Sequence, residues 1–248
     1  MYIGNDPSST TSTAEYNVAV GTTALDAVTT GDQNIAVGYN ALSTNTTGNY
    51  NTAVGYGALS SNTDGPSNTA LGRHALYANT TGSSNLAFGN NALASNTSGN
   101  SNEAFGVNAL YSNTTGSNNL ASGSRALRNN TTGDYNIASG YKAGEVITTG
   151  SNNIIIGYEA EPSANDASNQ IVIGKGATGQ ADNSVTLGNA DVTAIYMAQD
   201  SGATVYAAGL NIGGTAVSST AAELNLSLIH ISEPTRLLSI SYAVFCLK

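Results

Sequence analysis

The sequence has little charge and few large aromatic side chains. Only 9% of its 248 residues are charged, and it contains no Trp and three Phe, whereas about a quarter of a typical globular domain is charged. Asn, Thr, Ser, Ala and 28 Gly dominate instead. This composition excludes a core of large side chains. Because the apolar residues recur at fixed spacing, it does not indicate disorder either.

Positive charge and cysteine are also scarce. Lys and Arg number seven against 16 Asp and Glu, which gives a formal net charge of −9. We therefore expect no nucleic-acid partner, since phosphates are bound by clusters of cations. The single cysteine, Cys246, excludes a disulfide framework. The first residues lack the basic and apolar regions of a secretory signal, and no segment has transmembrane length, so no membrane insertion is expected.

A repeat of 17 residues runs without interruption from Asn17 to Asn169. Asn occupies the first position, Gly the fifth and Ala the eighth in all nine blocks. Leu occupies the ninth position except at Gly144 and Glu161, and Gly occupies the fifteenth except at Ala167. In the second block these recurring positions are occupied by Asn34, Gly38, Ala41, Leu42 and Gly48. The third position of that block is Ala36.

The block length and its internal pattern predict an all-β, parallel β-solenoid with one coil per block. A helical-pair repeat needs about thirty residues or more. Apolar and small residues alternate over the first five positions, which is the period of a strand. Asn-Thr-Thr-Gly, as at 45–48, is typical of a tight turn because Asn and Gly tolerate the left-handed region.

The two faces of the predicted strand differ in side-chain size. The second and fourth positions carry β-branched or aromatic residues, such as Val18, Val20, Leu86 and Phe88, and we expect them to fill the coil interior. The first, third and fifth positions carry Asn, Ala and Gly. An outward face of small residues indicates close approach of another backbone. We therefore favour a homotrimer, the alternative being a monomeric solenoid whose Ala and Gly serve tight stacking alone.

After the nine blocks the period shortens. QIVIGKGATGQADN, at 170–183, is a 14-residue unit, and SVTLGNADVTA follows from Ser184. Both resemble the head repeat of YadA-type trimeric autotransporter adhesins, and the 17-residue blocks, such as NTAVGYGAL, are also similar to repeats of phage tail fibres. The resemblance implies a left-handed parallel β-roll, assembled as a trimer, on a fibre that touches cell surfaces. LNIGGTAVSSTAAELN, at 210–225, resembles the connector of phage-type fibres.

The chain divides by composition into five segments. LSLIHISEPTR and ISYAVFCL near the C-terminus match the translation of a common sequencing adapter, so we expect this end to be an artefact that interrupts a longer fibre. The expected segments are an N-terminal cap or lead-in at 1–16, solenoid repeats at 17–169, shorter repeats at 170–195, a β-rich connector at 196–225 and the adapter-like end at 226–248.

The residues that could carry chemistry are scattered. We expect no enzyme activity, metal site or cofactor, since Asp166, Asp182, Asp191 and Asp200 lie in different turns and His74 is a lone residue at a variable position. The best candidates for surface contact occupy the sixth position of their blocks, where the side chain should point outward. They are Tyr39, Tyr56, Tyr141 and Tyr158. Their alternative role is stacking between successive coils.

These features predict a fibre segment that attaches to a cell surface through a glycan or protein receptor. The alternative is a passive spacer that holds a separate receptor-binding domain at reach. No autotransporter signal, heptad stalk or membrane anchor is visible, so a virion tail fibre is favoured over a bacterial surface adhesin. Ice binding is disfavoured because the Thr rows fall in turns rather than on a strand face.

Overall fold

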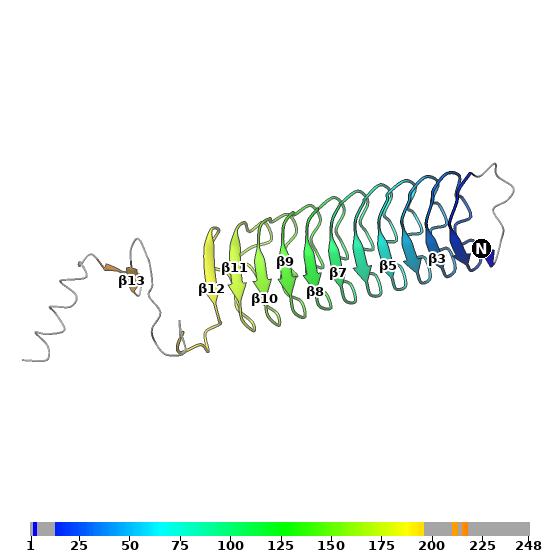
Figure 1. The fold of residues 1–248 in the computed structure, drawn as a ribbon. Coiled ribbons are helices and arrows are strands. Elements are labelled where there is room, and N and C mark those ends of the chain that lie inside the picture. The colour runs from blue at the N-terminus through cyan, green and yellow to red at the C-terminus, as the bar shows by residue number, and fades with distance from the viewer. Residues whose placement is uncertain (1, 4–12, 196–209, 213–214, 218–248) are drawn as a thin grey trace, which may run out of the picture. The chain divides into compact units, whose positions relative to one another are not determined.

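The structure is a computed structural model, which describes residues 2–3, 13–195, 210–212 and 215–217. Within these residues it is all-β, and the part up to Thr193 is a parallel β-solenoid (Figure 1). The predicted fold class is thus confirmed for the solenoid. A separate unit from Ala194 onward contains an antiparallel pair, β13 (Leu210–Ile212) and β14 (Thr215–Val217). The adapter-like end, Cys246 and Asp200 lie outside the described residues.

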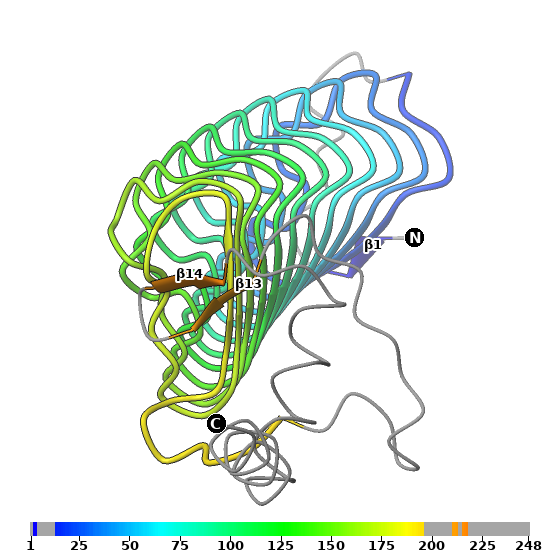
Figure 2. The same cartoon turned by 90° about the vertical axis from the view of Figure 1, so that its left-hand side faces the viewer.

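Twelve short strands form one sheet along the solenoid, in the order of the chain. They are β1 (Tyr2–Ile3), β2 (Val18–Val20), β3 (Ile35–Val37), β4 (Thr52–Val54), β5 (Thr69–Leu71), β6 (Leu86–Phe88), β7 (Glu103–Phe105), β8 (Leu120–Ser122), β9 (Ile137–Ser139), β10 (Ile154–Ile156), β11 (Gln170–Ile173) and β12 (Ser184–Leu187). Each strand pairs in parallel with the next, and successive coils lie over one another when viewed from the end (Figure 2).

The repeat length sets the register between coils. Ala36 pairs with Ala53, one block later, and the same 17-residue step holds from β2 to β11. Between β11 and β12 the step falls to 14, since Gln170 pairs with Ser184. Equivalent residues therefore stack in rows along the solenoid. We number the coils 1 to 9 from Asn17 to Asn153.

The expected orientation of the strands was wrong. The third-position alanines face the interior and are at most 3% exposed, as at Ala36 and Ala87, and the first-position Asn side chains are buried with them. The second- and fourth-position residues, such as Ile35 and Phe88, face outward instead. The reason is the narrowness of the coil: Leu and Ala of the opposite wall fill it, which leaves room for little more than a methyl group at the strand.

Glycine at the fifth position is required by both conformation and space. Gly55 has a φ of 139°, and a Cβ there would lie 2.5 Å from the carbonyl oxygen of Gly72 in the next coil. L-residues rarely adopt such a φ. The corner after each strand can therefore be made only by a stack of glycines, which explains why no other residue occurs at this position in the nine blocks.

The ninth-position leucines stabilise the interior despite an unfavourable backbone. Leu93, for example, is fully buried although its φ is 52°. Where leucine is missing, at Gly144 and Glu161, larger side chains enter elsewhere: Ile147 replaces a buried Asn, and Ile155 replaces a strand alanine. Volume is thus conserved across neighbouring coils, as close packing requires.

Two rows of buried asparagines bridge the coils. In the first-position row, Asn34 accepts a bond from the backbone N–H of Asn51 and donates to the carbonyl of Gly48. In the twelfth-position row, each side-chain amide from Asn62 to Asn130 donates to the Oδ1 of the asparagine in the preceding coil, as from Asn62 to Asn45 at 2.8 Å. Among the described residues the thin core thus combines 30 buried apolar residues with 16 polar ones. The repeat itself supplies hydrogen-bond partners to the buried asparagines, except to the Oδ1 of Asn130.

Candidate interaction surfaces

The four candidate tyrosines lie at the outer surface and stack in two pairs. The rings of Tyr39 and Tyr56 have centroids 5.2 Å apart at an interplanar angle of 21°, and those of Tyr141 and Tyr158 are 5.3 Å apart at 26°. Their side chains remain between 38% and 51% exposed. Stacking along the solenoid and availability to a partner are therefore both compatible with the structure.

His74 is not the isolated surface residue that its sequence position suggested. Its ring centroid lies 5.3 Å from that of Tyr56 and 4.8 Å from that of Tyr77. Gly57, one coil earlier, makes room for it, because a Cβ at Gly57 would lie 2.8 Å from the imidazole Cδ2. Partial burial, and secondarily the charge of Arg73, lower the pKa of His74, which favours the uncharged ring.

Arg73 completes this cluster. Its guanidinium carbon lies 6.0 Å from the centroid of the Tyr56 ring, within the range of a cation–π contact. Of the three cations at the sixth and seventh positions of coils 1 to 9, which include Arg125 and Lys142, it alone forms no ion pair. We call Tyr39, Tyr56, Arg73, His74 and Tyr77 the aromatic strip. No sequence motif indicates it directly, since its members come from three coils and from the sixth, seventh and tenth repeat positions.

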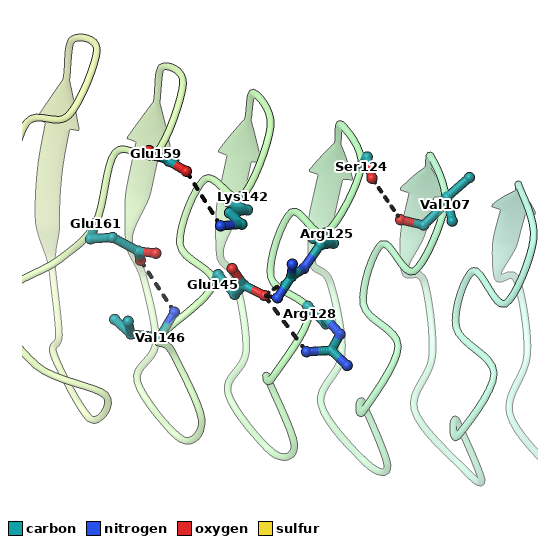
Figure 3. Close-up of polar contacts among 9 residues, drawn as sticks. All are labelled: Val107, Ser124, Arg125, Arg128, Lys142, Glu145, Val146, Glu159 and Glu161. Atoms are coloured by element: carbon teal, nitrogen blue, oxygen red, sulfur yellow. Dashed lines mark hydrogen bonds and ion pairs between the residues drawn. The ribbon is translucent and has the colours of Figure 1, made fainter.

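A second group of side chains forms a charged cluster on coils 7 to 9 (Figure 3). It comprises Arg125, Arg128, Lys142, Glu145, Glu159 and Glu161. Glu145 accepts ion pairs from Arg125 at 2.5 Å and from Arg128 at 3.7 Å, while Lys142 lies 3.3 Å from Glu159. Cations that are dispersed along the sequence therefore meet in space, because the coil stacks repeat positions on one another.

Glu161 is the unpaired acid of this cluster. It occupies the ninth position, where Pro162 restricts the preceding backbone to the β region, and its Oε2 accepts a bond from the Val146 N–H at 3.2 Å. Burial, with the nearby carboxylates of Glu145 and Glu159, raises its pKa from 4.5 to about 7. A pKa near 7 makes this carboxyl sensitive to small changes of pH.

The outward face of the strands carries an apolar stripe. We define it as the residues at the second and fourth positions of each repeat, which lie on strands β2 to β12. All of them are exposed or half-exposed. Phe88 and Phe105 stack upon it with centroids 5.5 Å apart. Glu103 is its one charged member. Contiguous apolar patches of more than a few hundred Å² mark interaction sites in soluble proteins.

Asp182 and Asp191 have structural contacts, whereas Asp166 is exposed. Asp182 accepts bonds from the Ser168 N–H and the Gln170 side chain, which lower the pKa of its carboxyl. Asp191 contacts only Asn189 through its side chain. Among the described residues no three His, Cys, Asp or Glu side chains are placed to hold a metal ion. No helix in that part of the chain is long and apolar enough to span a bilayer.

A hollow of about 370 Å³ lies at the last coil and contains no titratable side chain. Its lining residues are Gly176, Thr178, Gln180, Thr186, Gly188, Asn189 and Ala190. Comparison of the chain with family models, with curated proteins and with solved structures gave no match.

Proposed function

We propose that this chain is a non-enzymatic fibre segment, assembled as a homotrimer of left-handed β-rolls, that attaches a particle or cell to a cell surface. The observation that carries the proposal is the apolar stripe. It runs along eleven successive strands, from Val18 to Leu187. Within the described solenoid residues of one chain, no helix or strand packs over it. An apolar surface of this length is stabilised when other chains cover it.

Identical copies are the partners that fit the stripe best. Because every coil advances by the same step, a second copy in parallel register presents equivalent positions at each level, and closed symmetry then covers every stripe. Eleven strands at about 4.8 Å per strand give a contact of roughly 50 Å along the fibre. The number three rests on the resemblance of QIVIGKGATGQADN and its neighbours to YadA-type head repeats.

The small-residue outer face that the sequence predicted is absent, because the alanines lie inside each coil. Self-association is favoured by the opposite property. Large apolar residues face outward, and their burial between chains would contribute about 25 cal/mol per Å² of covered surface.

Attachment would use the surfaces that follow the glycine corner, which lie outside the stripe. Three copies would present each such surface three times, and repeated weak contacts would combine into useful avidity. A virion tail fibre is the favoured setting and the bacterial cell surface the alternative. A passive spacer remains the second candidate function, supported by the regularity of the coils.

Binding of the fluorescently labelled chain to a panel of bacterial cells tests the adhesive role. We expect saturable binding by the wild type and a loss of about tenfold or more in the variant Phe88→Asp/Phe105→Asp, which breaks the stripe and removes avidity. The matched control is Ser98→Asp/Thr115→Asp, which adds the same charges to the same two coils at the exposed fourteenth position, outside the stripe, where Asp64 occurs naturally. An assembled wild type that binds no cell would contradict adhesion and favour the spacer.

A further inference from the structure

The aromatic strip differs from every other part of the solenoid surface that the structure describes. Four rings follow one another from coil 2 to coil 4, with centroid separations of 5.2 Å, 5.3 Å and 4.8 Å. Tyr39, Tyr56 and Tyr77 are 47%, 51% and 44% exposed. The strip is therefore a continuous surface on the side of the coil, partly apolar and open to solvent.

Its construction uses an exception in the repeat. The seventh position adopts a left-handed backbone in each coil, and in the 17-residue blocks it is glycine only at Gly57. That glycine provides the space in which the His74 ring lies between Tyr56 and Tyr77. The comparable pair, Tyr141 and Tyr158, is joined by no third ring.

The charge of the strip is uncompensated. At the sixth, seventh and tenth positions, coils 2 to 5 carry no Asp or Glu, while Arg73 contributes a full positive charge. In the charged cluster, by contrast, Arg125, Arg128 and Lys142 all have Glu partners. On a chain with a net charge of −9, Arg73 is thus a local site for an anionic group.

We propose that the aromatic strip binds a saccharide that carries a carboxylate, with Arg73 contacting the carboxylate and the tyrosines contacting the apolar face of the sugar. A guanidinium matches a carboxylate through two parallel N–H donors. Tyr rings offer flat, half-apolar surfaces that lose little entropy on contact. The inference rests on the proposed attachment role and names its ligand class.

An acidic peptide fits the strip less well. Peptides are usually bound by a free strand edge or by an apolar groove. The strands β3 to β5 beneath the strip are paired on both sides, so no edge is free there. The polar neighbours are short side chains, such as Asn40, Ser43 and Ser60, which suit hydroxyl groups better than a peptide backbone.

Titration calorimetry on the full chain tests this assignment with three probes. A hyaluronan hexasaccharide and sialyllactose both carry carboxylates, and binding of either supports the proposal while showing which kind of sugar is preferred. A neutral chitin hexasaccharide should bind at least tenfold more weakly, because it lacks the group that Arg73 recognises. Failure of both acidic saccharides to bind at millimolar concentration would overturn the proposal.

Two variants locate the site, and each uses a residue that the repeat already tolerates at that position. Arg73→Ser introduces the residue that occupies the same repeat position at Ser124. Tyr56→Thr introduces the residue that occupies it at Thr22. Both should reduce the affinity for the acidic saccharide about tenfold. Tyr141→Thr, the matched control at the same position of coil 8, should leave it unchanged. Unchanged affinity in Arg73→Ser would contradict the assignment.

Two further measurements separate this inference from the proposed function. Poly-glutamate should bind more weakly than the acidic saccharides, and equal affinity would show that any anion suffices, which would overturn the saccharide assignment. The mass of the chain in solution is measured on the same samples. An assembled trimer that binds no saccharide would refute only the saccharide site at the aromatic strip. A monomer that binds the saccharide would refute only the trimer.

Discussion

Asn130 donates its side-chain amide to the Oδ1 of Asn113 across 2.8 Å, but its own buried Oδ1 has no partner. The row of twelfth-position asparagines ends here because the next coil carries Ile147. The same coil carries Gly144 in place of leucine, and the isoleucine occupies part of the space that the leucine would fill. A polar row is thus interrupted for a packing reason.

Restoring both repeat residues together should stabilise coil 8. In Gly144→Leu/Ile147→Asn the new asparagine can donate to Asn130 Oδ1, and the leucine refills the interior. Gly144→Leu alone should destabilise the chain by about 1–3 kcal/mol, because a Cβ there would already lie 3.1 Å from Leu127 Cδ2 and 3.3 Å from Ile147 Cδ1. Chemical denaturation of the two single variants and the pair measures this coupling. Additive effects would show that the two sites are independent.

The twelfth-position row of asparagines should contribute strongly to the stability of each coil. Asn96 donates to Asn79 Oδ1 and to the Gly99 carbonyl, and accepts from Asn113. Asn96→Ala leaves these buried partners unsatisfied and should lower the free energy of unfolding by about 2 kcal/mol or more. The adjacent Ser95→Ala is the control, since alanine occurs naturally at this position, as at Ala78. Equal stability of the two variants would show that the row contributes little.

The fifth-position glycine corner should tolerate no side chain. Gly55→Ala places a Cβ against the Gly72 backbone at a φ of 139°, and we expect a loss of about 3 kcal/mol or more. Gly176→Ala is the control, because its φ is 59° and no atom lies within 4 Å of the added Cβ; its cost should be about 1 kcal/mol. Hydrogen exchange of the backbone amides around each substitution would compare the two directly. A well-protected coil 3 in Gly55→Ala would contradict the account of the corner.

Glu161 should make the solenoid less stable as the pH rises. Its folded pKa of about 7 lies above the ordinary value of 4.5, so the folded state binds the proton more tightly. The corresponding stabilisation is complete below the unfolded pKa and is lost as the pH rises through 7. As the pH rises from 4.5 to 7, the melting temperature of the wild type should therefore decrease relative to that of Glu161→Gln. Parallel pH profiles of the two proteins would show that this carboxyl does not contribute.

The repeat predicted the β-solenoid because the invariant spacing of Asn, Gly and Ala is a property of the chain alone. It did not predict which strand face is buried. Alternation of Ile35, Ala36 and Val37 identifies two faces, but the assignment to inside or outside depends on the width of the coil, which Leu42 and Ala41 of the opposite wall determine. Hydrophobicity alone favoured the wrong face.

The candidate sites were predictable only in part. Tyr39 and Tyr56 occupy one repeat position, so their stacking follows from the register. His74 and Tyr77 join them from other positions, and the space at Gly57 that admits the imidazole becomes visible only when the coils are stacked. The charged cluster was missed for the same reason, since Arg125 and Glu145 are 20 residues apart.

The most direct test of the account is the mass of the purified chain in solution, measured by size-exclusion chromatography with light scattering. The outward apolar stripe predicts self-association, and the proposed trimer has three times the 25.0 kDa of one chain; the Phe88→Asp/Phe105→Asp variant should convert it into single, folded chains. A wild type that elutes with the mass of one chain, across the concentration range of the measurement, would contradict the proposal of a trimeric fibre.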